Sequence, residues 1–205
     1  MKPILYSFRR CPYAMRARIA LAASGCRVEL REVVLRDKPQ AFLDASVSAT
    51  VPTLVSKSET IDESLDIMIW ALKRNDPFDW LDMSDTGYAW IERADGPFKT
   101  HLDRTKYANR YEGADPNHHR SRASEFLSEL DLQIDDWIFK RPSLADYAIL
   151  PFVRQFAFID KPWFDAQPWP KLQAWLERFL QSDEFSSMMS KYAQWHEGDA
   201  PIYFP

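Results

Sequence analysis

A cysteine near the start of the chain stands where a predicted strand is followed by a predicted helix. Residues 4–8 are mainly apolar and aromatic, as in a buried strand, and residues 14–23 are rich in alanine without a helix breaker. Pro12 suits the first position of that helix, because the N–H that proline lacks would have no partner there. Cys11 therefore falls at the N-terminal cap, where unpaired backbone amides and the positive end of the helix dipole meet its sulfur.

This position suits a reactive thiolate. An isolated thiol has a pKa near ~8.5, but helix N-termini and nearby cations lower the pKa of a cysteine by several units. Arg9, Arg10 and Arg16 are close to Cys11 in the sequence and add positive charge. We therefore interpret Cys11 as a functional nucleophile. The alternative is a buried cysteine that packs as a small hydrophobic residue, which is the usual role of a free cysteine.

The composition is that of an ordinary globular protein. The 205 residues are 46% hydrophobic and 27% charged, enough for one large domain or two small ones, and the apolar runs are too short to cross a membrane. Two cysteines, Cys11 and Cys26, cannot build a secreted disulfide framework. No signal peptide is visible, since charged residues interrupt the N-terminus by Arg9. These features favour a reducing, cytoplasmic location.

Charge is unevenly distributed along the chain. Residues 1–75 contain 12 Lys and Arg against 8 Asp and Glu, a charge of +4, and with a net charge of −4 this leaves −8 for residues 76–205. The positive first part favours a small anionic ligand. The acidic total and the lack of a basic stripe argue against nucleic-acid binding.

The pattern of apolar residues predicts two domains. The first reads β-α-β-α-β-β-α and ends at Asn75-Asp76-Pro77, and from residue 83 onward only helices are predicted. The predicted boundaries are residues 1–76 for the α/β domain, 77–84 for the linker and 85–205 for the all-helical domain. The later elements of the first domain are expected at residues 27–34, 38–43, 52–55, 59–61 and 63–73, and the helices of the second at 86–111, 121–138, 143–158 and from Pro170.

Two polar features of the second part carry little chemistry. Ser143 and Asp146 have the spacing of a capping box and are assigned to folding, as the start of the second domain's central helix. His118 and His119 follow a polar segment, point in different directions and lack the spacing of zinc ligands. We interpret both histidines as solvent-exposed and expect no metal site.

Four short motifs, in order along the chain, resemble those of cytosolic glutathione transferases. Residues 11–14 (Cys-Pro-Tyr-Ala) are similar to the Cys-Pro-aromatic-Ala motif of the cysteine-type members, notably the omega class. Residues 35–39 resemble the segment where that class has a glutathione-contacting lysine. Residues 51–54 resemble the family's Val-Pro-x-Leu and residues 62–64 its Glu-Ser pair. The resemblance implies an N-terminal thioredoxin-like (glutaredoxin-like) domain with a mixed sheet and a C-terminal all-helical domain.

The resemblance also implies a glutathione site. In the family, a cis bond before Pro52 turns Val51 so that its backbone pairs with the cysteinyl part of glutathione. Glu63 and Ser64 would hold the γ-glutamyl end, and Lys38 would pair with the glycyl carboxylate. Taken alone, such a Glu-Ser pair is also an ordinary helix start, and a lone lysine is usually only solvated.

The resemblance implies glutathione as a co-substrate without a metal. It further implies a hydrophobic or thiol-reactive second substrate and a homodimer, with no nucleic-acid or membrane partner. The loop at residues 45–50 lacks the Asn-Pro and Gly that family members often carry, which leaves its contacts with the ligand open.

Three functions are consistent with these residues. The first is a glutathione-dependent thiol transferase or reductase that passes through a Cys11–glutathione mixed disulfide. Dithiol glutaredoxins resolve such a disulfide with a second cysteine three residues after the first. This chain has Ala14 there, so a second glutathione would have to resolve the disulfide. The second is conjugation of glutathione to electrophiles, and the third is a regulatory or binding protein without enzymatic activity.

Overall fold

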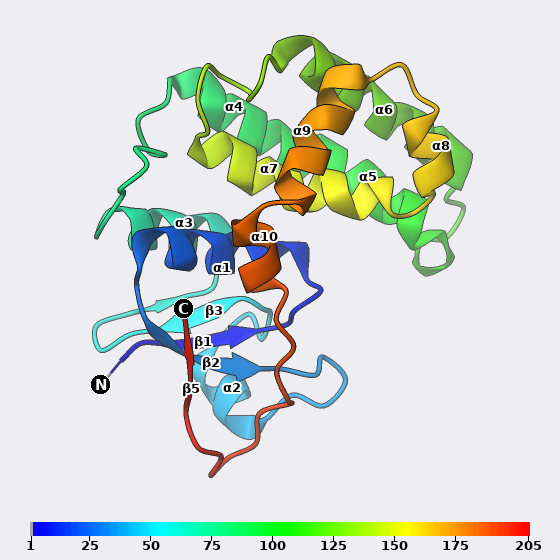
Figure 1. Cartoon of the computed structure of the whole chain (residues 1–205). Helices are drawn as coiled ribbons and strands as arrows, with labels where there is room; N and C mark the ends of the chain where they lie inside the picture. Colours follow the sequence, from blue (N-terminus) through cyan, green and yellow to red (C-terminus); the bar gives the residue numbers. More distant parts are fainter. Residues whose placement is uncertain (1) are drawn as a thin grey trace. The chain divides into compact units, whose positions relative to one another are not determined.

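The computed structural model describes residues 2–205 and divides into two compact units. The first unit is Met1–Leu81 with Ser182–Pro205, and the second is Asp82–Gln181. Within the described residues the first unit has a five-stranded mixed sheet in the order β4-β3-β1-β2-β5 (Figure 1). Only β1 and β2 are parallel, and the other neighbours are antiparallel. The strands are β1 (Ile4–Ser7), β2 (Val28–Glu32), β3 (Thr53–Val55), β4 (Thr60–Ile61) and β5 (Ile202–Phe204).

Helices cover both faces of this sheet. Figure 1 shows α1 (Pro12–Ser24) and α3 (Ser64–Leu72) on one face and α2 (Gln40–Ala45) on the other. The predicted order β-α-β-α-β-β-α is confirmed, and with it the thioredoxin-like first domain. Helix α1 ends at Ser24 and is followed by Gly25, whose φ of 68° is the left-handed conformation that glycine adopts at helix ends. Helix α1 packs against α3, and the buried residues of the two helices are mainly apolar, including Ala17, Leu21, Ile67 and Met68.

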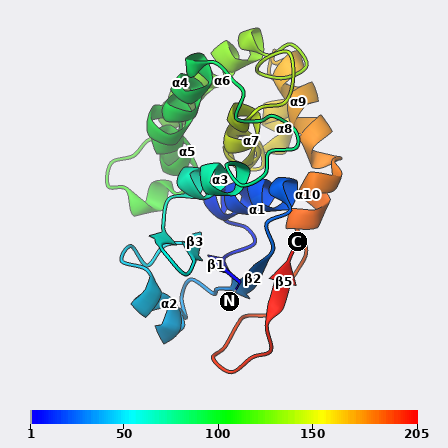
Figure 2. The same cartoon turned by 90° about the vertical axis from the view of Figure 1, so that its left-hand side faces the viewer.

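The C-terminal residues differ from the sequence-based assignment. The sequence places all of residues 85–205 in the helical domain, whereas Ser182–Pro205 belongs to the first unit. Helix α10 (Asp183–Met188) packs against α1, and β5 pairs antiparallel with β2, Val28 opposite Phe204 and Leu30 opposite Ile202 (Figure 2). A three-residue strand carries too short a pattern to be recognised locally, since its pairing partner is far away in the sequence.

The second unit is helical. A single long helix is predicted over residues 86–111, but the continuous helical stretch ends at Lys106 and only a 3-10 turn follows. It also changes type midway, because Ala94–Phe98 forms a π-helical turn that contains Gly96-Pro97. Proline lacks an N–H and crowds the preceding turn, so a wider turn accommodates it. The elements are α4 (Asp85–Arg93), the π turn, α5 (Lys99–Lys106), a 3-10 turn (Ala108–Arg110), α6 (Pro116–Gln133), α7 (Leu144–Ala157), α8 (Lys161–Asp165) and α9 (Pro170–Leu180).

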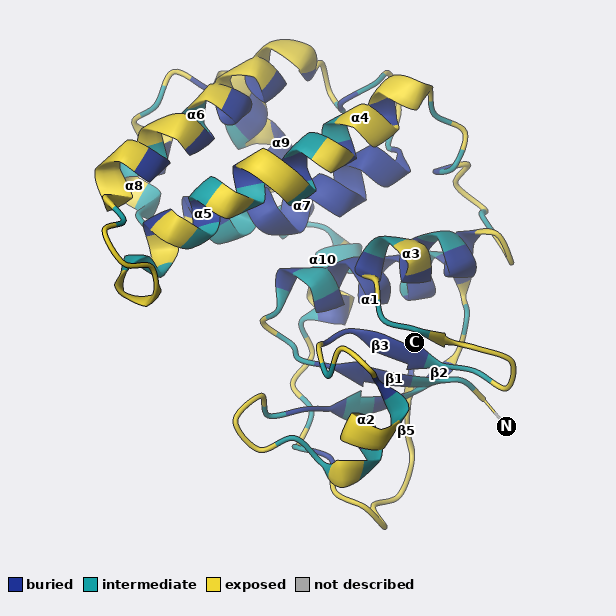
Figure 3. Ribbon diagram, turned by 180° about the vertical axis from the view of Figure 1, so that it is seen from behind, coloured by how far each residue is buried: buried dark blue, intermediate teal, exposed yellow. Residues whose placement is uncertain are grey.

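Helix α7 is the buried centre of this unit, as predicted. Nearly all of it is dark blue in Figure 3, and its capping box is formed, with Asp146 Oδ2 accepting from the Ser143 N–H at 2.9 Å and hydroxyl at 2.7 Å. Asp146 Oδ1 also accepts from the Ile138 N–H at 2.9 Å and the Trp175 indole at 3.0 Å. This carboxylate therefore ties three segments together, which is the folding role the sequence assigns to it.

The interpretation of His119 as solvent-exposed is wrong. Helix α6 begins at Pro116, five residues before its predicted start, so His119 lies on a helix face and is only 8% exposed. Its Nδ1 lies 2.8 Å from the Nδ1 of His101 on α5, and burial lowers the pKa of both histidines. One ring must donate to the other at this distance, which leaves the accepting ring neutral. His118 is exposed, as expected.

Two features are absent from residues 2–205. No three or more His, Cys, Asp or Glu side chains in that range gather so that they could hold a metal ion. Nor does any helix in that range combine the length and the apolar character needed to cross a membrane.

Candidate active site

Cys11 occupies the N-cap of α1, as predicted. Its backbone is extended, with φ −76° and ψ 123°, and Pro12 follows at the first helical position. The Cys11 N–H donates to the Phe8 carbonyl at 3.0 Å, and its own carbonyl accepts from the Met15 N–H at 2.9 Å. The turn of residues 8–11 thus presents the sulfur at the positive end of a 13-residue helix. Both Cys11 and Cys26 are free thiols and partly buried.

Val51 lies directly beside this sulfur. The Val51–Pro52 bond is cis, and the Cys11 Sγ donates to the Val51 carbonyl at 3.6 Å. Both residues contact one apolar cluster, in which Val51 is buried and Cys11 packs at the edge. The structure therefore brings together Cys11, Val51 and Pro52, which the sequence names from two segments about 40 residues apart.

The cations around Cys11 differ in their surroundings. Arg10 is exposed and Arg9 partly buried, whereas Arg16 and Arg18 are almost wholly buried on α1. Arg18 Nη1 donates to the Met188 carbonyl at 2.8 Å, and Arg16 Nη1 to the Ser64 hydroxyl at 3.5 Å. Burial lowers the pKa of Arg18.

Glu32 holds the turn that carries Cys11. Its Oε1 accepts the Arg9 N–H at 2.7 Å, across 23 residues of sequence. Burial raises the pKa of Glu32, and the Arg9 N–H and the charges of Arg18 and Arg9 oppose that rise. Ser7 is the register partner of Glu32 on the parallel strand β1. Buried atoms without a hydrogen-bond partner among residues 2–205 include Ser7 Oγ, Glu32 Oε2, and Arg18 Nε and Nη2.

The start of α3 is connected to this site. Ser64 is 3% exposed and joined to α1 through Arg16, whereas Glu63 is exposed at the N-cap.

Asp62, just before α3, accepts from Thr53 Oγ1 at 2.7 Å, from Ser46 Oγ at 2.8 Å and from the Ser48 N–H at 3.4 Å. Burial alone would raise the pKa of Asp62, but these hydrogen bonds outweigh it and hold the pKa below its ordinary value. The N-terminus of this nine-residue helix is a position suited to an anion.

Lys38 is not simply solvated. It is partly buried, and its Nζ donates to the Ala49 carbonyl at 2.9 Å. An ammonium group has three N–H donors, so this bond leaves others for a carboxylate. Ala49 has a φ of 50°, a left-handed conformation that favours glycine, at the loop that lacks the family's usual glycine.

The sequence missed Glu32 and Arg18. A signal for Glu32 exists, because Val28, Leu30 and Glu32 all point to the buried side of β2 in strict alternation. A carboxylate at an inward position of a strand needs a partner. That partner, the Arg9 amide, follows from no local pattern.

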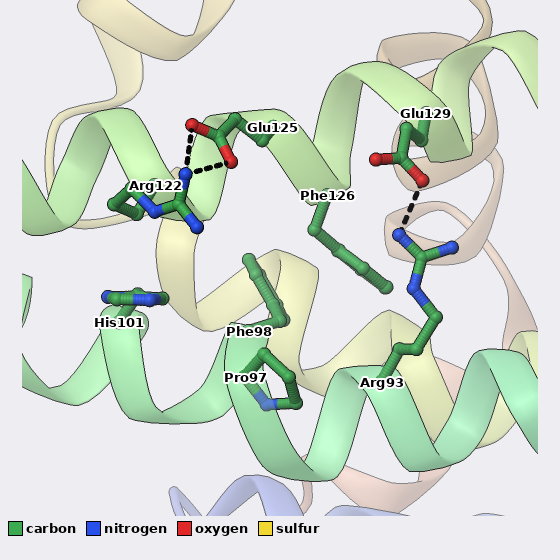
Figure 4. Close-up of a pocket in the computed structure, with 8 residues that line it drawn as sticks. All are labelled: Arg93, Pro97, Phe98, His101, Arg122, Glu125, Phe126 and Glu129. Carbon is green, nitrogen blue, oxygen red and sulfur yellow. Dashed lines mark hydrogen bonds and ion pairs between the residues drawn. The ribbon is translucent and has the colours of Figure 1, made fainter.

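The second unit contains a separate small pocket of about 110 Å³ between α6 and the α4–α5 segment (Figure 4). Phe98 and Phe126 stack at its centre with ring centroids 4.7 Å apart. Its charged groups are paired, Arg93 with Glu129 at 2.5 Å and Arg122 with Glu125 at 2.6 Å. Ligand pockets commonly measure about 300–1,000 Å³, so this pocket is too small for a typical substrate. Its lining is Arg93, Pro97, Phe98, His101, Arg122, Glu125, Phe126 and Glu129.

Two family models match the chain. "Glutathione S-transferase, N-terminal domain" matches residues 5–77, and "Glutathione S-transferase, C-terminal domain" matches residues 88–178. A probable glutathione transferase of Aplysia californica is 40% identical over 57 residues, which is 28% of this chain and 62% of that protein. The match thus spans less than two thirds of that relative.

Solved structures share the fold over nearly the whole chain. Glutathione transferase Omega 3C of Trametes versicolor has a TM-score of 0.79 at 19% identity, with 95% of this chain and 91% of that chain covered. A glutathione transferase family member of Pseudomonas fluorescens pf-5, solved with two glutathione molecules bound, has a TM-score of 0.78 at 19% identity and 92% coverage of both chains.

Proposed function

We propose a function for this chain that starts from its family, because the chain belongs to the glutathione S-transferase family. The proposed function is that of a glutathione-dependent thiol transferase of the cysteine type, in which Cys11 is the nucleophile. The observation that carries this proposal is the place of the Cys11 sulfur, at the N-cap of α1 and 3.6 Å from the Val51 carbonyl. The resemblance assigns the Val51 backbone to the cysteinyl part of glutathione. A glutathione sulfur bound there would lie beside Cys11.

The reaction has two exchanges. The Cys11 thiolate attacks the glutathione sulfur of a mixed disulfide, so that a Cys11–glutathione disulfide forms and the substrate leaves as a thiolate that takes up a proton. A second glutathione, as thiolate, then attacks the glutathione sulfur of that adduct. Oxidised glutathione leaves and the Cys11 thiolate is restored. The net reaction converts the glutathionylated substrate and one free glutathione into the substrate thiol and oxidised glutathione.

The remaining contacts follow from the charges around the site. The N-terminus of α3, with the Ser64 hydroxyl, Glu63 and the buried Arg16 guanidinium behind it, would hold the γ-glutamyl end. Lys38 would bind the glycyl carboxylate through the N–H groups that the Ala49 carbonyl does not take. These assignments rest on the family resemblance and agree with the positive charge of the first 75 residues.

The test compares the two cysteines of the chain. Incubation with oxidised glutathione should add one glutathionyl group to the wild type and to Cys26→Ser, and none to Cys11→Ser, as read by intact-protein mass spectrometry. Turnover of a glutathionylated substrate should follow the same pattern. A Cys11→Ser variant that still turns over that substrate would exclude the mechanism. Activity on an aryl halide that survives Cys11→Ser would instead favour conjugation of glutathione to electrophiles.

We also propose, from the family resemblance, a homodimer in the cytoplasm and a hydrophobic or thiol-reactive second substrate. Light scattering of the purified chain tests the assembly, because a monomer at micromolar concentration would contradict it.

A further inference from the structure

The chain after α10 runs past the sheet and returns to form its edge strand. Residues 190–205, here called the C-terminal strap, pass the end of β2, turn at residues 196–199 and return as β5 (Figure 1). The His196 N–H donates to Asp199 Oδ2 at 2.7 Å and the Asp199 N–H to the His196 carbonyl at 3.1 Å. Gly198 has a φ of 93° within this turn. The strap is therefore an ordered part of the first unit.

Trp195 anchors the strap in the interior. It is 9% exposed and belongs to the apolar cluster that contains Tyr6, Phe42 and Val51. The Trp195 N–H donates to the Glu32 carbonyl at 2.9 Å, and the Arg31 guanidinium lies 4.1 Å from the centre of the indole ring. The same cluster packs against Cys11. A residue of the strap thus shares one apolar core with the backbone assigned to glutathione and with the proposed nucleophile.

The neighbouring strap residue binds the loop that carries Lys38. Gln194 Nε2 donates to Asp37 Oδ2 at 2.8 Å, across 157 residues of sequence. Asp37 precedes Lys38, whose Nζ donates to the Ala49 carbonyl, and Ala49 lies two residues before Val51. A continuous series of contacts therefore runs from the strap through Lys38 to Val51.

Without the strap, the loop before Lys38 has few internal supports. Residues 35–37 are exposed, and the turn is closed by the Asp37 N–H, which donates to the Val34 carbonyl at 2.8 Å. A loop that becomes ordered only when the ligand binds loses conformational entropy in the binding step, and this loss weakens binding. A loop that is already held in place does not have this cost.

We propose that Trp195 and Gln194 are positioning residues of the glutathione site. The strap holds the loop of residues 33–38 in place, so that Lys38 and Val51 face glutathione before it binds. This inference rests on the proposed function, because it assigns the strap a role at that same site. Neither residue is proposed to touch the reacting sulfur atoms.

The experiment measures glutathione binding by calorimetry in a Cys11→Ser parent, where no covalent adduct can form. Trp195→Ala should weaken binding about tenfold or more, Gln194→Ala a few-fold, and Trp195→Phe should restore most of the affinity. Tyr203→Ala is the matched control. It removes another ring that lies under an arginine, that of Arg27 at 5.0 Å, but it lies in β5 and outside the cluster with Val51. It should stay within about twofold of the parent.

Hydrogen exchange separates positioning from general stability. Peptides covering residues 33–39 should exchange faster in Trp195→Ala and Gln194→Ala than in Tyr203→Ala, and peptides of α1 should not change. Gln194→Ala removes only the exposed hydrogen bonds to Asp37, so it remains informative should Trp195→Ala fail to fold. Equal loss of binding in the Tyr203 and Trp195 variants, or unchanged exchange at residues 33–39, would overturn the inference. A Cys11→Ser parent that binds no glutathione would instead reject the proposed function, and the strap's role with it.

Discussion

Replacing Glu32 tests whether one carboxylate holds the Cys11 turn. Its Oε1 accepts the Arg9 N–H at 2.7 Å, and the side chain is 8% exposed. A hydrogen bond to a charged acceptor contributes about 1.5–3 kcal/mol, and the Cγ methylene that alanine lacks adds about 0.8 kcal/mol. Glu32→Ala removes both and should lower the free energy of unfolding by about 2–4 kcal/mol. Glu32→Gln keeps the methylenes and an accepting oxygen, so its loss should be about 1 kcal/mol.

Urea unfolding at pH 7 measures both variants, and NMR hydrogen exchange of the Arg9 amide reports the bond itself. Arg9 should stay protected in the wild type and in Glu32→Gln and lose protection in Glu32→Ala. Equal destabilisation by the two substitutions would refute the reasoning, because only one of them removes the acceptor. So would an Arg9 amide that remains protected in Glu32→Ala.

The pH dependence of Glu32 has a definite sign. Burial raises its native pKa, so the native state holds the Glu32 proton more tightly than the unfolded state does. The resulting stabilisation is present below the ordinary glutamate pKa and is lost as the pH rises through the native pKa. The stability of the wild type relative to Glu32→Gln should therefore fall as the pH rises from about 4, the ordinary glutamate range, through the native pKa. A difference that stays constant or grows over this range would contradict the burial argument.

Three further substitutions test local features. Asp62→Asn should lower the free energy of unfolding by about 1–2 kcal/mol at pH 7 and by progressively less below about pH 4, as measured by urea unfolding. Hydrogen bonds hold the native pKa of Asp62 low, so the contribution of the carboxylate disappears as the pH falls through that pKa. Ala49→Gly should raise the free energy of unfolding by about 0.5–1 kcal/mol, since it relieves a φ of 50°; a thermal midpoint below that of the wild type would contradict this. Ser143→Ala should lower the free energy of unfolding by about 2 kcal/mol and Ser143→Thr by clearly less, because threonine keeps the hydroxyl that donates to Asp146 and alanine does not. Equal losses in denaturant unfolding would show that this hydrogen bond is not the cause.

Patterns contained within one segment could be read from the sequence. The junction at Cys11-Pro12, the capping box at Ser143 and the order of elements up to α3 all depend on neighbouring residues, and the structure confirms them. The same logic would have placed the start of α6, because Asp115 caps it and Pro116 is its first residue, just as Pro12 opens α1. His119 would then have been expected on a helix rather than in a polar loop.

What the sequence could not show depends on pairing between distant segments. β5 is three residues long, and it is a strand only because β2 offers a free edge. The carboxylate of Glu32 was visible at an inward position, but nothing near it in the sequence names the Arg9 amide as its partner. Trp195 is likewise one of eight tryptophans, and its place in the cluster with Val51 follows from the course of the strap.

Glu32 links the turn that carries Cys11 to the C-terminal strap, because both its side chain and its main chain accept hydrogen bonds. Its side chain accepts the Arg9 N–H in the turn that carries Cys11, and its carbonyl accepts the Trp195 N–H of the strap. The main-chain bond does not depend on the identity of the side chain, so substitutions at residue 32 act on the turn and leave the strap's backbone partner in place. Substitutions at Gln194 remove the hydrogen bond to Asp37 in the loop before Lys38 and leave the carboxylate of Glu32 in place. The turn that carries Cys11 and the loop of residues 33–38 can therefore be disturbed separately, although both are held at the end of β2.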